Sequence, residues 1–179
     1  MSDIDIARLL REHTREIADF PKPGVAFKDL TPLFADPAAF TTVVEDIAGR
    51  YRGTVDAVAG VEARGFIVGV PVALALGLPF VAVRKAGKLP GAVLGEDYEL
   101  EYGTARIEIV ADAVAGGDRV LLVDDVLATG GTAAAACTLL ERTGARVVGI
   151  AMLMELVFLG GRSALPDRDV LALLSIDGD

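Results

Sequence analysis

The sequence predicts an α/β fold in which a central, mostly parallel sheet is flanked by helices. Short runs of apolar, often β-branched residues alternate along the chain with helical patterns, which is typical of parallel strands buried on both faces. Two of these runs lead through a glycine-containing turn straight into a helical pattern, as in βα units. The length of 179 residues, without an internal repeat or linker, indicates a single domain over 1–179.

The N-terminal part is predicted to hold two helices separated by an irregular segment. Residues 3–18 place apolar side chains near helical spacing and predict an amphipathic helix. The proline-rich segment 20–32, FPKPGVAFKDLTP, predicts a loop. A second helix is expected from Asp36 and Pro37 to about Arg52, because proline suits the first helical turn.

The next elements are a short strand over 56–60 and a long run without charges over 66–83. That run is long enough to raise the question of a membrane span. Because prolines and glycines divide it, we interpret it as a buried helix that ends at Gly77 and a strand over 79–84. No basic and apolar leader opens the sequence, so we expect a soluble, cytoplasmic protein.

Residues 85–106 break the alternation, with four glycines and a proline among charges, and their later part alternates like a strand or hairpin. A helix or loop is expected up to Gly117, and a strand begins at Val120. After an alanine-rich helix, further strands are predicted over 146–154 and 170–176. A glycine-rich turn at 160–161 separates these two strands.

Composition excludes several classes of function. The net charge of −9 and the pI of about 4.6 argue against a nucleic-acid surface. The single cysteine, Cys137, rules out an intramolecular disulfide and a cysteine-rich zinc site, and we expect it to be a small buried filler. The single histidine, His13, argues against a Ser-His-Asp mechanism and is expected to be a solvated helix residue.

The most informative stretch is 120–132, VLLVDDVLATGGT. Its apolar strand ends on two carboxylates, Asp124 and Asp125, and a small glycine-containing loop then enters a helix. Glycines let backbone N–H groups converge, and the helix dipole favours an anion there, while carboxylates accept hydrogen bonds from sugar hydroxyls. The stretch predicts a ribose 5-phosphate site, although a tight turn with a helix cap would use similar residues.

Two other segments carry cations that fit phosphate. Arg64 follows a predicted strand in VEARG (61–65), where guanidinium can grip phosphate in bidentate fashion, although an exposed arginine at a helix start is common. The four lysines (Lys22, Lys28, Lys85 and Lys88) all fall in the irregular segments. Residues 84–103 have the composition of a lid, which a reaction sensitive to water requires, although long surface loops are also often disordered.

These segments resemble a known family. Residues 123–132 resemble the phosphoribosyl pyrophosphate (PRPP) signature of the type I phosphoribosyltransferases. The segments 20–34, 62–66, 84–91 and 100–103 occur in the order found in the adenine-specific members. Hypoxanthine-guanine enzymes resemble the chain in the PRPP motif alone, and the C-terminal part carries no motif that we use.

The resemblance implies a type I phosphoribosyltransferase fold, with a base-binding hood over 1–34 and a lid over 84–106. It implies the reaction of adenine and PRPP to AMP and pyrophosphate in purine salvage, with Mg²⁺ carried mainly by substrate and water, and a homodimer. The implied catalytic residues are Glu101 and Tyr102, and the implied adenine-binding residues are Ala26, Phe27, Lys28 and Leu127. The ribose and its phosphate would bind at Asp124, Asp125, Ala128, Thr129, Gly130, Gly131 and Thr132, and pyrophosphate at Arg64, Arg84, Lys85 and Lys88.

Two alternatives remain open from the sequence. One is transfer to another purine, such as guanine, hypoxanthine or xanthine, and the segment 20–34 is the feature that discriminates it. The other is a non-catalytic regulator that senses PRPP or a nucleotide. Such a regulator would be expected to carry a nucleic-acid-binding element or a basic face, and this acidic chain shows neither.

Overall fold

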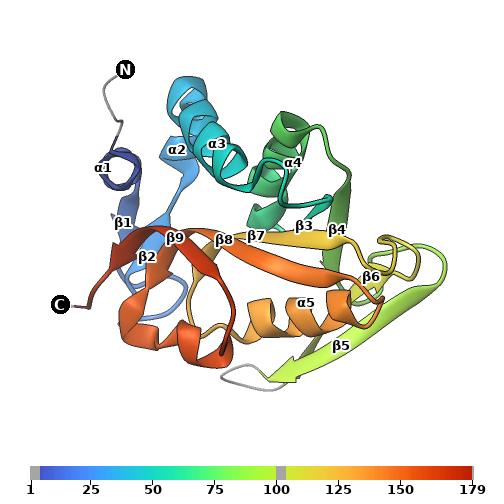
Figure 1. The fold of residues 1–179 in the computed structure, drawn as a ribbon. Coiled ribbons are helices and arrows are strands. Elements are labelled where there is room, and N and C mark those ends of the chain that lie inside the picture. The colour runs from blue at the N-terminus through green and yellow to red at the C-terminus, as the bar shows by residue number, and fades with distance from the viewer. Residues whose placement is uncertain (1–4, 100–103, 179) are drawn as a thin grey trace.

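The computed structural model describes residues 5–99 and 104–178, and its centre is a seven-stranded sheet. The strand order is β5-β6-β4-β3-β7-β8-β9, in which β3, β4, β7, β8 and β9 are parallel, while β6 is antiparallel to both β4 and β5. Figure 1 shows α3 and α4 over one face of this sheet and α5 over the other. The predicted α/β class with a mostly parallel, helix-flanked sheet is confirmed.

The sheet strands are β3 (Ala57–Val61), β4 (Phe80–Lys85), β5 (Val93–Glu99), β6 (Thr104–Val110), β7 (Arg119–Leu127), β8 (Arg146–Leu156) and β9 (Val170–Ile176). The helices are α1 (Ile6–Glu12), α2 (Thr31–Ala35), α3 (Pro37–Tyr51), α4 (Arg64–Leu76) and α5 (Gly131–Glu141), with short 3₁₀ turns η1 (Val157–Leu159) and η2 (Gly161–Ala164). A separate hairpin of β1 (Arg15–Ile17) and β2 (Phe27–Asp29) lies beside the end of β9 in Figure 1.

Two apolar cores cover the two faces of the sheet. Alternate residues of β7 divide between them: Val120 and Leu122 join the core beneath α5, while Leu121 and Val123 join the core beneath α3 and α4. Because both faces are covered, the central strands consist almost entirely of apolar residues, and every residue of β3 is buried. Among the residues that the structure describes, no helix combines the length and the apolar character needed to cross a membrane.

The N-terminal segment differs most from its prediction. The helix expected over 3–18 ends at Glu12, and Arg15 to Ile17 form β1, paired with β2 inside the segment expected to be a loop. His13 caps α1 and is not a solvated helix residue: its Nδ1 lies 2.9 Å from the carbonyl oxygen of Leu9, and its Nε2 lies 3.2 Å from a carboxylate oxygen of Asp36. Tertiary pairing therefore overrides the helical spacing of this segment.

Boundaries elsewhere follow the sequence closely, with two differences. The strand predicted to end at Asp124 continues as β7 through Leu127, so the two carboxylates belong to the strand and do not follow it. The segment left as helix or loop before Gly117 begins with the strand β6. Cys137 is fully buried, as predicted, and burial raises the pKa of its thiol to about 11.

Candidate functional site

A cavity of about 460 Å³ opens at the carboxyl ends of the parallel strands. Its walls come from the β2 hairpin, the β3–α4 turn, the end of β4 and the end of β7 with the loop that follows. Ligands of open parallel sheets bind at this edge, because the strands end together there and helices begin there. The cavity therefore collects most of the segments that the sequence singled out.

The carboxylate pair forms one wall. Asp125 is 5% exposed, and its Oδ2 atom lies 2.8 Å from Nε of Arg64. Asp124 accepts a hydrogen bond from the backbone N–H of Asp125 at 2.9 Å. Burial and, secondly, the neighbouring Asp125 charge raise the pKa of Asp124 well above its usual range. A carboxyl with a raised pKa beside a carboxylate paired with arginine can both donate hydrogen bonds to vicinal hydroxyl groups and accept hydrogen bonds from them.

The loop between β7 and α5 forms a smaller hollow beside the main cavity. The hollow has a volume of about 90 Å³ and is lined by Asp124, Ala128, Thr129, Gly130 and Thr132, among others. Gly130 adopts a left-handed conformation with φ 81° at the N-cap of α5, which an L side chain rarely takes. The hollow thus lies at the positive end of an eleven-residue helix and has the size of a small anion.

Arg64 lines the main cavity and contacts two of its walls. It is the first residue of α4, and its guanidinium carbon lies 5.2 Å from the ring centroid of Phe27. Together with the ion pair to Asp125, this contact places one cation across both the carboxylate pair and the aromatic ring. Lys85 also lines the cavity, so two of the predicted phosphate-binding cations converge there.

The other two predicted cations are not brought to the cavity. Arg84 precedes Lys85 in β4, and successive strand residues point to opposite faces. The Nε atom of Arg84 donates to a carboxylate oxygen of Glu62 at 3.1 Å, and its Nη1 donates to the carbonyl oxygen of Lys88 at 3.0 Å. The hydrogen bond from Arg84 and that from the backbone N–H of Lys85 lower the pKa of Glu62. Arg84 is therefore engaged with Glu62 and with the backbone of Lys88, and neither Arg84 nor Lys88 lines the cavity.

Two of the four predicted base-binding residues line the main cavity and two do not. Phe27 and Lys28 line the main cavity, whereas Ala26 lines an adjoining cavity of about 570 Å³ that shares Lys28 with it. Leu127 does not line the main cavity, because it is 1% exposed and lies in the core beneath α5. Its neighbour Val126 lines the main cavity, whereas Leu127 lines the smaller hollow, so Val126 is the better candidate for the wall that was expected of Leu127.

Eight residues that line the main cavity were not among the predicted site residues: Val61, Glu62, Ala63, Val83, Tyr98, Ile107, Val126 and Leu156. Glu62 belongs to the β3–α4 turn, Tyr98 comes from β5, and Leu156 ends β8. The rule that parallel strands end together would have indicated Leu156, since β8 pairs with β7. Glu101 and Tyr102, the predicted catalytic residues, lie outside the described residues.

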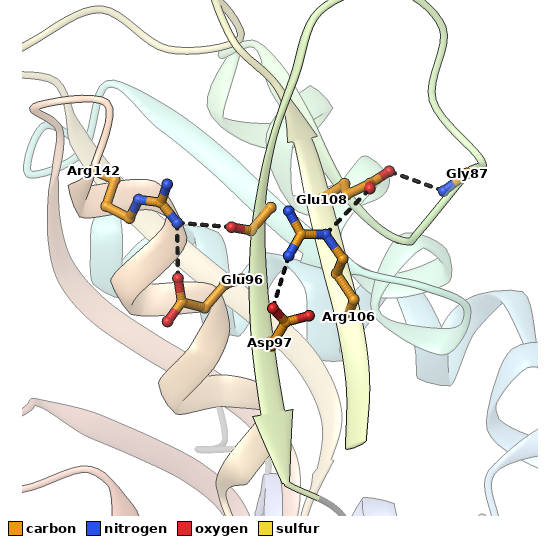
Figure 2. Close-up of polar contacts among 7 residues, drawn as sticks. Gly87, Glu96, Asp97, Arg106, Glu108 and Arg142 are labelled. Atoms are coloured by element: carbon orange, nitrogen blue, oxygen red, sulfur yellow. Dashed lines mark hydrogen bonds and ion pairs between the residues drawn. The ribbon is translucent and has the colours of Figure 1, made fainter. Parts of the chain in front are cut away.

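The β5–β6 hairpin, part of the predicted lid, is tied to the body of the domain near its base. Figure 2 shows Arg142, at the end of α5, donating through Nη1 to the carbonyl oxygen of Gly95 at 2.7 Å and to Glu96 at 2.8 Å. The buried Glu108 accepts a hydrogen bond from the backbone N–H of Gly87 at 2.9 Å. These contacts fix both strands of the hairpin and the turn that leads into it.

A family model and curated relatives both match this chain to phosphoribosyltransferases. The phosphoribosyl transferase domain family matches residues 34–173. Adenine phosphoribosyltransferase of Streptomyces galbus is 60% identical over 162 residues, covering 90% of this chain and 89% of the relative. The enzyme of that name from Acidothermus cellulolyticus is 55% identical over 177 residues, covering 98% of this chain and all (100%) of the relative.

Solved structures agree with these relatives. A structure of adenine phosphoribosyltransferase from Thermoanaerobacter pseudethanolicus matches with a TM-score of 0.92 and 47% identity, over 95% of this chain and 99% of that one. The Saccharomyces cerevisiae enzyme, complexed with an imino-altritol bisphosphate and adenine, matches with a TM-score of 0.90 and 40% identity, over 94% and 98% of the two chains.

Proposed function

The chain belongs to the phosphoribosyl transferase domain family, and we propose that it transfers the ribose 5-phosphate of PRPP to adenine, giving AMP and pyrophosphate. One observation carries this proposal. The main cavity joins the carboxylate pair at the end of β7 with the ring of Phe27, and an anion-sized hollow at the N-terminus of α5 adjoins it. Those three environments match the diol, the phosphate and the flat base of the product AMP.

In this proposal the end of β7 and its loop hold the sugar phosphate. Asp124 and Asp125 orient the ribose hydroxyls, and the loop from Ala128 to Thr132 binds the 5′-phosphate. The backbone N–H groups and the positive end of α5 supply the attraction, so this part of the site needs no side-chain cation. Catalysis then rests mainly on positioning and electrostatics.

The base is proposed to stack between Phe27 and Val126, which both line the cavity. The backbone polar groups of Ala26 and Lys28 would read the edge of the ring, because a carbonyl and an N–H together distinguish an amino from an oxo substituent. The Lys28 side chain forms an ion pair with Glu16, so it is engaged away from the base. A backbone contact therefore accounts for the position better than a side-chain contact.

Arg64 and Lys85 are proposed to stabilise the leaving pyrophosphate. As the bond from C1′ to the pyrophosphate oxygen breaks, negative charge grows on that oxygen and positive charge on the ribose. N9 of adenine forms the new bond to C1′ and gives up its proton, and we propose Glu101 as the acceptor, with Tyr102 as its neighbour. Arg84 and Lys88 remain predictions for pyrophosphate, and Arg84 would first have to leave Glu62.

Mg²⁺ fits this site as an ion carried by the substrate. The cavity offers carboxylate oxygens of Asp124 and Asp125, which hard cations accept, although Oδ2 of Asp125 is already paired with Arg64 at 2.8 Å. The described residues contain no group of three or more His, Cys, Asp or Glu that could hold a metal, so PRPP and water would complete the coordination. When bound, the ion would neutralise charge on the pyrophosphate.

The proposal includes a homodimer in the cytoplasm. Helix α4 exposes Ile67, Val70 and Leu74, three apolar side chains on one face, and Leu74 is 75% exposed. An apolar helical stripe of this kind is typical of a subunit interface. The buried, unpaired Cys137 is compatible with a reducing compartment.

The direct test of the proposed reaction is product analysis. The purified protein is incubated with adenine, PRPP and Mg²⁺, and the products are separated and quantified by chromatography. We expect AMP and pyrophosphate in equal amounts, with none when PRPP is omitted. Consumption of PRPP without AMP, or no consumption of either substrate, would contradict the proposal.

A further inference from the structure

Two glycines interlock the loop after β7 with the turn after β8. A Cβ atom added to Gly130 would lie 2.2 Å from the carbonyl oxygen of Gly161, and one added to Gly161 would lie 2.3 Å from the carbonyl oxygen of Ala128. Such distances are far inside van der Waals contact, so neither position takes a side chain without a backbone shift. Each backbone segment therefore limits where the other can lie.

An ion pair between a buried carboxylate and a half-exposed arginine holds the second of these segments in place. Glu155, near the end of β8, is 4% exposed, and its carboxylate receives Nε and Nη2 of Arg162 at 2.9 Å and 2.8 Å. The remaining nitrogen, Nη1, donates to the carbonyl oxygen of Val170 at 3.1 Å. The buried carboxylate of Glu155 is destabilising without a cation beside it, and the planar guanidinium of Arg162 binds it through two nitrogens in one orientation. The turn that carries Arg162 is therefore fixed relative to β8.

The proposed phosphate loop, from Ala128 to Thr132, depends on neighbouring segments for its conformation. Its consecutive glycines, Gly130 and Gly131, have wide conformational freedom, and backbone N–H groups bind a phosphate well only when they already converge. The neighbouring turn supplies the missing constraint, because Gly161 is buried against Ala128 and Gly130. The side chain of Leu127 also packs against this turn, since its Cγ atom would lie 3.0 Å from a Cβ atom added to Gly161.

We propose that the turn η2, Gly161–Ala164, is the platform that shapes the 5′-phosphate loop, with Gly161 and Arg162 as positioning residues for PRPP. This inference rests on the proposed function, since it takes the occupant of the loop to be the PRPP phosphate. Residues of the C-terminal part of the chain thereby set the affinity for PRPP without touching it. The affinity for adenine is independent of the platform.

Two adjacent glycines provide a matched test. Gly161 is crowded by Ala128 but has no positive φ, whereas Gly160 has φ 66° and no atom within 4 Å of an added Cβ. Gly161→Ala therefore displaces the loop, and Gly160→Ala strains only its own backbone. We expect Gly161→Ala to raise the KM for PRPP by about tenfold or more, since a small misplacement is costly, while the KM for adenine changes by less than about twofold. Gly160→Ala should lower the melting temperature and leave both KM values near wild type.

A pair of arginine variants tests the ion pair between Arg162 and Glu155 separately. It also covers the case in which Gly161→Ala does not fold. Arg162→Lys keeps the charge but loses the fork, and it should raise the KM for PRPP by about fivefold. Arg168→Lys is the control, because Arg168 forms a similar two-nitrogen pair with Glu141, at 2.8 Å and 2.9 Å, at the far end of α5. It should leave the KM for PRPP unchanged.

The outcomes separate this inference from the proposed function. An unchanged KM for PRPP in both Gly161→Ala and Arg162→Lys would overturn the platform, as would equal increases in the two controls. If the wild-type protein makes no AMP, the proposed function fails. Calorimetric titration of PRPP into the same four variants then still decides whether the platform shapes the loop.

Discussion

Replacing Arg64 by methionine should change the affinities for the two substrates in opposite directions. Arg64 bridges the carboxylate pair and the aromatic ring in the cavity, through the 2.8 Å ion pair to Asp125 and the 5.2 Å approach to Phe27. PRPP must draw this cation toward its pyrophosphate, whereas adenine must displace it from the ring. Methionine keeps most of the side-chain volume and removes the charge.

The magnitudes follow from the contacts that are lost. A hydrogen bond to a charged group contributes about 1.5–3 kcal/mol, so losing the contact to pyrophosphate should raise the KM for PRPP by roughly 10- to 150-fold. The Arg64 side chain is 38% exposed, which places its contact with the ring of Phe27 at about 0.5–1 kcal/mol. Removing that contact should tighten adenine binding to the free enzyme by about two- to fivefold.

The assay is calorimetric titration of each substrate into the free protein, with steady-state kinetics beside it. Arg50→Met is the control, because Arg50 pairs with Asp46 on α3, outside the residues that line the cavity. Weaker binding of both substrates to Arg64→Met, or no change in PRPP affinity, would refute the assigned position of this cation. The control should bind both substrates as the wild type does.

Three further predictions follow from the same structure. Val126→Ala should raise the KM for adenine several-fold with little change in stability. Leu127→Ala should lower the free energy of unfolding in urea by about 2–5 kcal/mol and leave the KM for adenine near wild type. The reverse pattern would indicate that Leu127, and not Val126, contacts the base. Asp125→Asn, and likewise Glu101→Ala, should lower kcat at least about 100-fold while circular dichroism shows a retained fold, and near-wild-type turnover in both would contradict the assigned roles. Both ring nitrogens of His13 face acceptor atoms, and the hydrogen bond to the Leu9 carbonyl, followed by that to Asp36, raises its pKa above 6.5. The charged form is favoured in the folded state, so His13 should stabilise the protein fully below about pH 6.5 and lose that contribution as the pH rises through the raised value. Urea unfolding should therefore show that His13→Gln is destabilising at about pH 5.5 and nearly neutral at about pH 9, and an equal effect at both would contradict the pairing.

The sequence predicted those parts of the site whose signals are local. An apolar strand, two carboxylates, a glycine loop and a helix follow one another within 120–132, and the structure places them as one strand, one loop and one helix. The strand nevertheless continues past the carboxylates to Leu127. Val126 therefore lines the main cavity, whereas Leu127, the last residue of the strand, is buried in the core beneath α5.

The parts that the sequence did not predict depend on tertiary contacts. Arg15 to Ile17 continue a helical pattern but form a strand because β2 offers a partner. Arg84 and Lys85 are equivalent as cations, yet Arg84 is paired with Glu62 and only Lys85 itself lines the cavity. The approach of Gly161 to the phosphate loop joins segments about thirty residues apart, and no local pattern encodes it.

The proposed site should select adenine among the purines. A single reaction containing adenine, guanine and hypoxanthine at equal concentration, with limiting PRPP and Mg²⁺, measures that selectivity directly. The site described here predicts that AMP accounts for nearly all of the nucleotide formed, because the backbone of Ala26 and Lys28 reads an amino and not an oxo substituent. GMP or IMP in comparable or greater amount would contradict the proposed selectivity for adenine.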